Sequence, residues 1–254
     1  MIKRSNDKLR DLNNYDNRAQ EILYNNKNNE ILNYEKLEKY HRFPYERYYD
    51  LISHYVKRDH KVLELGAGFG LHTEIILKSV NEATITDISE NCLRLIKKLY
   101  SNYRNFTVHK ADIETLPFKD CSFDAVCIAG SLSYGDYRLV KKEIFRVLKK
   151  DGYLIAVDSL NNNPLYVLNR YFSYFLGNRT MNTIRNMPSI KKLKYFQKNN
   201  KLLNFDFFGS LIWLVPCLKL FMGQNKIAHF IKYSDIIFKS KYLAFKFTIV
   251  IKKR

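Results

Sequence analysis

Cysteine is scarce in this sequence, and so are glycine and proline: its 254 residues include four, nine and five of them. The cysteines are Cys92, Cys121, Cys127 and Cys217. They form no CxxC pair and no spacing typical of a metal site, which disfavours a disulfide framework and a zinc site. We therefore expect a reduced, cytoplasmic protein without a bound metal.

A long hydrophobic segment is also missing. The longest apolar run, residues 209–223, is too short to cross a bilayer and contains Lys219. The basic N-terminus lacks the apolar region of a secretory signal. No membrane span is predicted. A peripheral contact of residues 209–223 with the inner face of a membrane, or a role in covering an active site, stays open.

Acidic residues are few compared with basic ones. The chain has 25 Asp and Glu against 43 Lys and Arg, a net charge of +18. Such a charge suits nucleic acid, because Lys and Arg neutralise phosphates. It also suits an acidic or membrane-associated substrate. However, the basic residues are spread along the chain, and asparagine-rich tracts such as YNNKNNEILN indicate a compositional bias without a function.

Apolar residues are plentiful, and from residue 61 onward short apolar runs alternate with helical patterns. Strands are predicted at 61–65, 83–88, 106–112, 123–130, 152–159, 202–209 and 244–251, and helices at 73–79, 90–103 and 137–150. Alternation of this kind indicates right-handed crossovers and a parallel sheet with helices on both faces.

The segments outside this alternation divide the chain further. Residues 1–57 are predicted as an N-terminal helical cap, with helical patterns at 16–43 and 44–56, and residues 58–160 as the α/β core. Residues 161–201 read as a helical insertion on the substrate side. Residues 202–254 complete the same domain with two strands and the helices between them.

Three glycines stand directly behind the first predicted strand, in KVLELGAGFGLHTEII. A structural turn needs one or two glycines. A dinucleotide fold uses G-x-G-x-x-G, whereas here the third glycine comes one residue early and Leu71 takes its place. A phosphate-binding P-loop needs Gly-Lys-Ser/Thr, which is absent. Glu64 precedes Gly66 by two positions, which leaves the pattern strand, acidic residue, Gly-x-Gly-x-Gly, helix.

In this pattern the sequence resembles the class I S-adenosylmethionine-dependent methyltransferases, of the methyltransferase type 11 kind. Asp87 ends the second strand, where the resemblance implies a contact with the ribose hydroxyls. Asp112 follows the third strand, where it implies a contact with the adenine amino group, with Ile113 against the ring. The stretches PFKDCSFDAVCIAGSLSY and EIFRVLKKDGYLIAV resemble the rest of that core.

The resemblance implies the fold, the cofactor and a set of binding residues. The expected fold is a Rossmann-like, doubly wound, mostly parallel seven-stranded sheet with an antiparallel last strand. The expected cofactor is S-adenosyl-L-methionine, with S-adenosyl-L-homocysteine as product. The implied cofactor-binding residues are Glu64, Gly66, Ala67, Gly68, Gly70, Asp87, Ile88, Asp112, Ile113 and Ala129.

Transfer of a methyl group to a hydroxyl needs a base that removes the hydroxyl proton. General-base catalysis of this kind accelerates a reaction by about 10²–10⁴-fold. Asp158, at the end of the fifth strand, and His41, in the helical N-terminal part, are the predicted catalytic residues. Asp136 is a third candidate. Each also has a structural interpretation: Asp158 as a cap, His41 as a surface residue and Asp136 as the N-cap of the helix at 137–150. His72 is predicted to be a structural part of the glycine loop.

The acceptor is indicated by residues 161–201, where aromatic and basic residues interleave as in sites for sugars, bases or phosphates. An amphipathic helical cap is the other interpretation. The segment resembles methyltransferases of bacterial surface-polysaccharide and glycolipid clusters, which implies O-methylation of a small-molecule, glycan or lipid-linked sugar acceptor. RNA methylation and a cofactor-binding scaffold without catalysis remain as alternatives.

Overall fold

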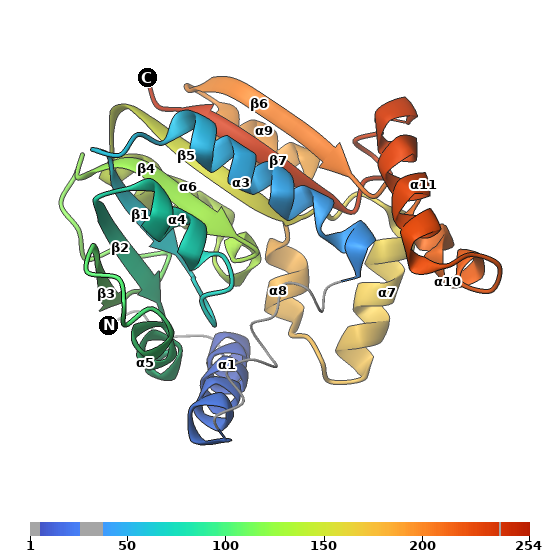
Figure 1. Ribbon diagram of the computed structural model, residues 1–254, viewed down its shortest axis with the longest axis horizontal. Coiled ribbons are helices and arrows are strands. Elements are labelled where there is room, and N and C mark those ends of the chain that lie inside the picture. Colours follow the sequence, from blue (N-terminus) through green and yellow to red (C-terminus); the bar gives the residue numbers. More distant parts are fainter. Residues whose placement is uncertain (1–5, 26–37, 239) are drawn as a thin grey trace.

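One seven-stranded sheet, in the order β3-β2-β1-β4-β5-β7-β6, forms the centre of the molecule (Figure 1). This computed structural model describes residues 6–25, 38–238 and 240–254. The strands are β1 (Lys61–Leu65), β2 (Glu82–Asp87), β3 (Phe106–Lys110), β4 (Phe123–Ala129), β5 (Leu148–Ser159), β6 (Lys201–Phe208) and β7 (Lys246–Lys252). Only β7 is antiparallel to its neighbours, β5 and β6. The predicted fold class is confirmed.

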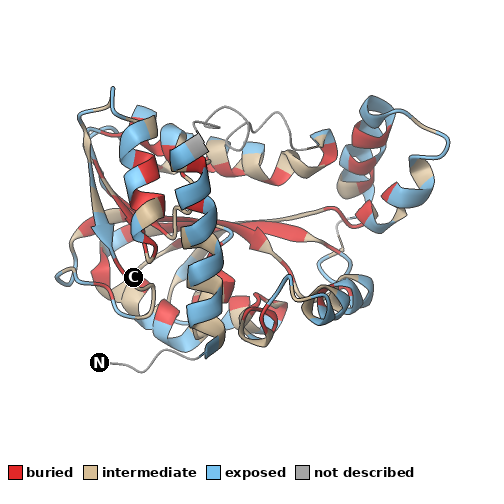
Figure 2. Cartoon of the chain, turned by 90° about the horizontal axis from the view of Figure 1, so that it is seen from below, coloured by how far each residue is buried: buried red, intermediate tan, exposed pale blue. Residues whose placement is uncertain are grey.

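Helices cover both faces of the sheet. They are α1 (Asn6–Asn25), α3 (Phe43–Tyr55), α4 (Thr73–Ser79), α5 (Glu90–Leu99), α6 (Tyr137–Val147), α7 (Pro164–Phe175), α8 (Met181–Asn186), α9 (Ile190–Gln197), α10 (Val215–Leu218) and α11 (Gln224–Ile237). On one face α3, α4 and α5 pack against the strands, and on the other α6 and α9 do so. Buried residues therefore concentrate in the sheet and the helix faces turned toward it (Figure 2).

The strand β5 begins earlier than the sequence predicts. A helix was predicted to continue to residue 150, but α6 ends at Val147 and Leu148 already pairs with Phe123 of β4. The side chain of Lys149 adds an ion pair with Asp124 at 2.8 Å. Strand pairing thus overrides the helical propensity of residues 148–150, and that part of the prediction is wrong.

The helix α5 is also shorter than predicted: it ends at Leu99 and not at residue 103. Tyr100 closes it with a backbone hydrogen bond to Ile96, and its hydroxyl donates to the carbonyl of Gly70. Tertiary contact with the glycine loop therefore ends the helical pattern of residues 90–103.

The N-terminal region has two separate roles. Helix α3, with Pro44 in its first turn as expected, buries Tyr48, Leu51 and Ile52 against the sheet. Helix α1 instead lies beside α5 at the carboxyl ends of the strands (Figure 1). Part of the helical pattern predicted over 16–43 lies outside the described residues. The domain boundaries predicted at 57, 160 and 201 stay predictions.

The segments after β5 are helical, as predicted. Between β5 and β6 lie α7, α8 and α9, and between β6 and β7 lie α10 and α11 with the short 3-10 helix η4 (Ile212–Leu214). None of the described helices is both long and apolar enough to span a bilayer.

Candidate functional site

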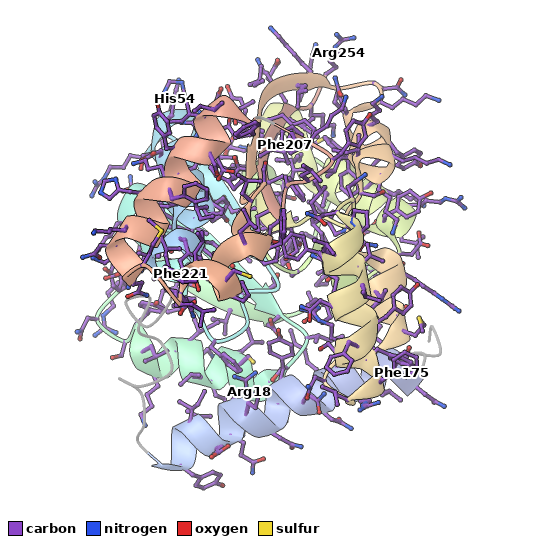
Figure 3. The ribbon with its side chains drawn as sticks, turned by 90° about the vertical axis from the view of Figure 1, so that its right-hand side faces the viewer. Arg18, His54, Phe175, Phe207, Phe221 and Arg254 are labelled. Carbon is purple, nitrogen blue, oxygen red and sulfur yellow. The ribbon has the colours of Figure 1, made fainter. Side chains whose placement is uncertain are left out.

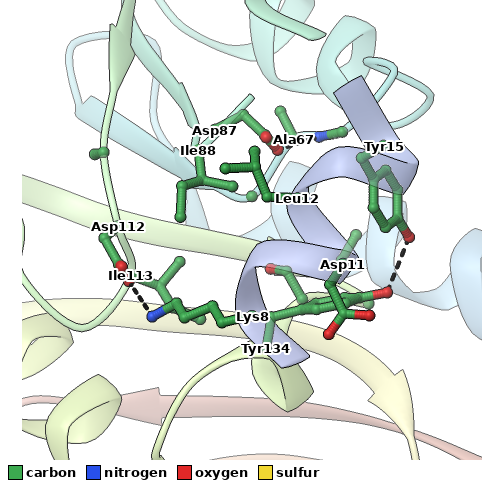
Figure 4. A pocket seen from close by; sticks show the side chains of 16 residues that line it. Lys8, Asp11, Leu12, Tyr15, Ala67, Asp87, Ile88, Asp112, Ile113 and Tyr134 are labelled. Carbon is green, nitrogen blue, oxygen red and sulfur yellow. Dashed lines mark hydrogen bonds and ion pairs between the residues drawn. The ribbon is translucent and has the colours of Figure 1, made fainter. Parts of the chain in front are cut away.

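A pocket with a volume of about 200 Å³ opens at the carboxyl ends of β1, β2 and β4 (Figure 4). The chain passes from β1 outward to β2 and β3, then returns to the other side of β1 as β4, so the pocket lies at the switch point of the sheet. Eight of the ten predicted cofactor residues line it: Gly66, Ala67, Gly68, Asp87, Ile88, Asp112, Ile113 and Ala129.

The loop after β1 needs glycine for two different reasons. Gly66 has φ +63°, and a Cβ there would lie 2.6 Å from the Cβ of Ser131. Gly68 has φ +55° and only distant neighbours, so its conformation, not space, favours glycine. Gly70 (φ +83°) faces away from the pocket, since a Cβ there would meet Ile96 and Tyr100. The first two glycines shape the wall and Gly70 fastens the loop to α5.

Asp87 connects the end of β2 to this loop. Its Oδ2 accepts a hydrogen bond from the backbone amide of Gly68 at 2.8 Å, and its Oδ1 accepts one from that of Ser89 at 2.9 Å. Burial raises the pKa of Asp87, while these backbone hydrogen bonds oppose the shift. The two amides hold the carboxylate in a fixed orientation on the pocket wall.

Asp112 forms an ion pair with a residue from the other end of the chain. Lys8 Nζ lies 2.8 Å from Asp112 Oδ1 and 2.6 Å from Glu114 Oε2 (Figure 4). Ile88 and Ile113 add apolar surface between the two aspartates. A carboxylate and a neighbouring isoleucine thus stand together on this wall.

Helix α1 covers the pocket with four side chains that the sequence prediction missed: Lys8, Asp11, Leu12 and Tyr15. The hydroxyl of Tyr15 lies 3.0 Å from that of Tyr134, another unpredicted lining residue (Figure 4). The spacing of Leu12, Tyr15, Ala19 and Ile22 is the signal that could have revealed this helix as amphipathic.

Polar contacts fasten α1 at two places. Asp16 accepts hydrogen bonds from the hydroxyl of Ser89 at 2.6 Å and from the side-chain amide of Asn91 at 2.8 Å. Five residues earlier in α1, Asp11 accepts a hydrogen bond from the hydroxyl of Thr180 at 2.8 Å. The helix therefore bridges α5 and the segment before α8 across the pocket mouth.

Glu64 lies beneath the loop and not in the pocket lining. It is 2% exposed, and its Oε2 accepts a hydrogen bond from the hydroxyl of Thr73 at 2.8 Å. Burial raises the pKa of Glu64 to about 7, with Asp87 adding to the shift. The contacts of Glu64 tie the end of β1 to the start of α4, so its observed role is in supporting the loop.

The two predicted catalytic residues are outside the pocket lining. Asp158 is 3% exposed, and its carboxylate accepts hydrogen bonds from the backbone amides of Leu132 and Ser159. His41 belongs to the 3-10 helix η2 (Lys39–His41), where its ring packs against Tyr40 and Phe245. Burial lowers the pKa of His41. Both side chains have structural contacts that account for their positions.

Asp136, the third candidate, and His72, predicted to be a structural part of the glycine loop, also make local contacts. Asp136 caps α6 by accepting from the backbone amides of Arg138 and Leu139, which is the structural interpretation of this residue. His72 stacks on Tyr45 and makes a 2.8 Å hydrogen bond with the hydroxyl of Tyr49. Burial lowers the pKa of His72 to about 3, so its ring stays neutral.

The chemistry of the lining suits a cationic ligand that carries a vicinal diol. Asp11, Asp87 and Asp112 supply three carboxylates, a carboxylate being the natural partner of a diol, and the loop backbone at Gly66 and Gly68 can approach a ligand without a Cβ in the way. Within the described residues no group of three or more His, Cys, Asp or Glu side chains could hold a metal ion.

Comparison with known proteins agrees with this arrangement. Residues 63–156 match the family described as "Methyltransferase domain". The curated demethylmenaquinone methyltransferase of Staphylococcus aureus is 32% identical over 124 residues, which cover 47% of this chain and 52% of that protein. The chain thus spans about half the length of the curated relatives it matches.

Solved structures share the fold at low sequence identity. A geranyl diphosphate C-methyltransferase from Streptomyces coelicolor, in complex with Mg²⁺, geranyl diphosphate and S-adenosyl-L-homocysteine, superposes with a TM-score of 0.60 at 14% identity, covering 84% of this chain and 80% of that one. The YcgJ protein of Bacillus subtilis superposes with a TM-score of 0.58 at 17% identity, covering 82% and 99%. The family match over residues 63–156, on this shared fold, supports a class I S-adenosylmethionine-dependent methyltransferase. None of the reported matches supports the surface-polysaccharide kind.

Proposed function

We propose that this chain transfers a methyl group from S-adenosyl-L-methionine to a hydroxyl of a small-molecule or sugar-bearing acceptor. The observation that carries the proposal is the pocket at the switch point of the sheet, where the glycine loop, Asp87 and Asp112 stand together. The S-adenosyl-L-homocysteine bound in one structural neighbour and the match over residues 63–156 support the choice of cofactor.

Each wall of the pocket has a role in this proposal. Asp87 would accept hydrogen bonds from the ribose hydroxyls, while Gly66 and Gly68 let the backbone approach the methionyl part. Asp112 and Ile113 would hold the adenine, in competition with the ion pair between Asp112 and Lys8. When bound, the cofactor supplies a methyl group on a good leaving group. The protein mainly orients the acceptor, and orientation can supply up to roughly 7–11 kcal/mol.

For the proton of the hydroxyl we propose Asp11 as acceptor, in place of Asp158 and His41. Asp11 lines the pocket, and its carboxylate is held by the hydroxyl of Thr180. Burial raises the pKa of Asp11, which makes it a better proton acceptor than an exposed aspartate.

Two experiments test the parts separately. Titration calorimetry with S-adenosyl-L-homocysteine tests the pocket, and a lack of measurable affinity would contradict the cofactor assignment. Incubation with methyl-labelled cofactor and fractionated cell extract tests the acceptor. Label in a glycan or lipid-linked sugar supports the proposal, label in RNA replaces it, and binding without any transfer indicates a scaffold.

Asp11→Asn isolates the proton step once an acceptor is known. The rate constant kcat should fall by roughly 10²-fold or more, while the Kd for cofactor stays nearly unchanged. Asp7→Asn is the matched control, because Asp7 is on the same helix and accepts a hydrogen bond from Asn182 outside the pocket lining. Equal effects of both variants would assign Asp11 to holding α1.

A further inference from the structure

Helix α7 exposes its apolar residues and buries a charged one. The side chain of Arg170 is 4% exposed, and its guanidinium donates to the carbonyl of Leu160 and the side chain of Asn161, both at 2.9 Å. The opposite face carries apolar residues at intervals of three and four that are 49–79% exposed: Leu165, Leu168, Phe172 and Phe175. A surface helix of a globular protein normally turns such a stripe inward.

The segment of α10 and α11 is apolar on both sides. Its inner residues, Ile227 and Ile231 among them, pack into a hydrophobic cluster. Its outer side chains include Phe221, which is 85% exposed, and Tyr233 and Ile237, which are 66% and 57% exposed. Burial of the inner face therefore leaves a second apolar surface uncovered.

These helices occupy the same end of the molecule. In Figure 1, α7, α10 and α11 lie together at the right, and in Figure 3, which faces that end, Phe175 and Phe221 both stand on it. Tyr166 of α7 packs against the hydrophobic cluster to which α10 and α11 contribute. We call the exposed side chains at this end the outer surface. Its apolar members include Leu165, Leu168, Phe172, Phe175, Phe221, Tyr233 and Ile237.

The charge of the chain is concentrated in the part that bears the outer surface. Residues 159–254 contain 17 of the 43 Lys and Arg but only two of the 25 Asp and Glu, so they carry +15 of the total +18. The basic residues are spread along the chain, as noted above, but the acidic ones are not. Among the described residues, Lys219, Lys226, Lys232 and Lys241 are exposed on or beside α10 and α11.

Both acidic groups of this part are already engaged. Asp206 forms an ion pair with Arg47 at 2.8 Å. Asp235 accepts hydrogen bonds from the backbone amides of Gly209 and Ser210. Lys219 pairs with Glu38 of the first part of the chain at 2.5 Å. The exposed Lys226, Lys232 and Lys241 meet little opposing charge from their own part of the chain.

We infer that the outer surface docks on an anionic lipid bilayer, its apolar side chains entering the acyl boundary and its lysines meeting the headgroups. Exposed aromatic and aliphatic side chains together with Lys are the composition of interfacial helices. Anionic leaflets attract such lysines electrostatically. A protein interface is normally depleted of Lys, and RNA offers no partner for the exposed leucines and isoleucines. The inference does not depend on the proposed function.

Sedimentation with lipid vesicles tests the inference on the full chain without cofactor. We expect binding to vesicles of phosphatidylcholine mixed with phosphatidylglycerol, weaker binding to phosphatidylcholine alone, and a decrease with salt. Phe172→Ser combined with Phe175→Ser should weaken the partition coefficient by roughly tenfold or more. Phe221→Ser tests the α10 segment separately.

Charge reversal and matched controls complete the test. Lys226→Glu with Lys241→Glu should weaken binding to anionic vesicles by roughly tenfold or more and leave binding to phosphatidylcholine unchanged. Leu139→Ser on α6 replaces an exposed apolar residue elsewhere and is compared with Phe221→Ser; Lys97→Glu on α5 reverses one exposed charge elsewhere and is compared with Lys226→Glu alone. Both controls should have no effect.

Three results would overturn the inference. The first is an unaltered chain that stays in the supernatant with anionic vesicles at low salt. The second is a control variant that weakens vesicle binding as much as the variants of the outer surface. The third is self-association, or retention of RNA, that the surface variants abolish in the absence of any vesicle binding. Unchanged thermal unfolding of each variant ensures that a loss reports on the surface.

Discussion

Residues 1–158 and residues 159–254 share one sheet but differ in what they present to solvent. The first part contains 26 basic and 23 acidic residues, the second 17 and two. The first part forms the pocket, whose wall carries three carboxylates, and the second places apolar side chains on the outside of α7 and α11. Inside the sheet the two parts are alike, since β7 is buried along nearly its whole length between β5 and β6.

The difference shows that the buried strands and the solvent-exposed residues of this protein meet separate requirements. A continuous sheet demands buried strands from both parts of the chain. The surfaces are free to diverge, and a cationic ligand favours an acidic pocket while an anionic partner favours a basic exterior. A change in the pocket should therefore alter cofactor binding alone, and a change in the outer part should alter stability or surface binding alone.

Gly66→Val should have the largest effect, and it should change a property of the first part only, the affinity for the cofactor. A Cβ there would lie 2.6 Å from Ser131, and φ +63° is a conformation that side chains with Cβ rarely adopt. We expect cofactor affinity to fall by roughly 100-fold or more, measured by titration calorimetry, with vesicle binding retained. Gly223→Val is the control, because no heavy atom lies within 4 Å of a Cβ at that position.

The pH dependence of stability should also come from the first part. Burial raises the folded pKa of Glu64 from 4.5 to about 7. Over that interval the unfolded chain releases the proton and the folded chain keeps it, so the contribution of Glu64 to the free energy of unfolding falls as pH rises toward 7 and levels off above it. The lowered pKa of His72 contributes in the opposite direction below its ordinary pKa of 6.5. The free energy of unfolding lost through Glu64 is up to about 3 kcal/mol. Glu64→Gln should abolish this loss, measured by urea unfolding between roughly pH 5 and 8.

A matched change on the surface separates this effect from a general one. Glu74 is half exposed and pairs with Lys78 one helical turn away. Glu74→Gln should leave the pH profile of unfolding as in the unaltered chain. A Glu64→Gln profile that keeps the same slope would show that Glu64 is already ionised throughout the interval.

Asp87→Asn tests the carboxylate at the end of β2. The amide side chain keeps one acceptor oxygen but loses the charge and one of the hydrogen bonds from Gly68 and Ser89. Hydrogen bonds to charged groups contribute about 1.5–3 kcal/mol, so cofactor affinity should fall roughly 10- to 100-fold. Asp59→Asn removes an exposed charge elsewhere and should leave the Kd unchanged. An equal Kd for all three proteins would contradict the assigned site.

Within the first part, the elements differ in how far the sequence predicts them. The strand at 61–65 and the helix at 73–79 are observed with the predicted ends, because a buried run and three glycines mark both boundaries locally. Ends set by tertiary contact, such as those of α6 and β5, were placed wrongly. Position along the chain also suggested Asp158 and His41 as pocket residues, but the direction of a side chain depends on its packing.

The sequence predicts a helical cap over residues 1–57, but not the residues through which it covers the pocket. Helix α1 reaches it through contacts between residues far apart in the sequence, such as Lys8 with Asp112 and Asp11 with Thr180. The amphipathic spacing of α1 could have been recognised, but not the surface against which it packs. The outward apolar face of α7 is a comparable case, since the burial of Arg170 and the packing of Tyr166 show which side of that helix faces inward.

Arg170→Met examines the outer part directly. In the unaltered chain the guanidinium donates to the carbonyl of Leu160 at 2.9 Å. Its loss leaves that carbonyl without this donor, which should lower the free energy of unfolding by roughly 2 kcal/mol. Leu168→Ser, on the exposed side of the same helix, should change it by less than about 0.5 kcal/mol. A more stable Arg170→Met protein would mean that the cost of burying the charge exceeds its hydrogen bonds.

Asp16→Ala should have the smallest effect. It acts in the first part, where α1 covers the pocket. The variant loses the hydrogen bonds from Ser89 and Asn91 that hold α1 to α5. A loss of about 1 kcal/mol should speed hydrogen exchange of the α1 amides roughly fivefold and leave the strand amides unchanged. Glu21→Ala, at an exposed position of the same helix, should change neither. If the strands and α1 exchange faster together, α1 unfolds with the core, and it is then part of the domain and not a separate cover.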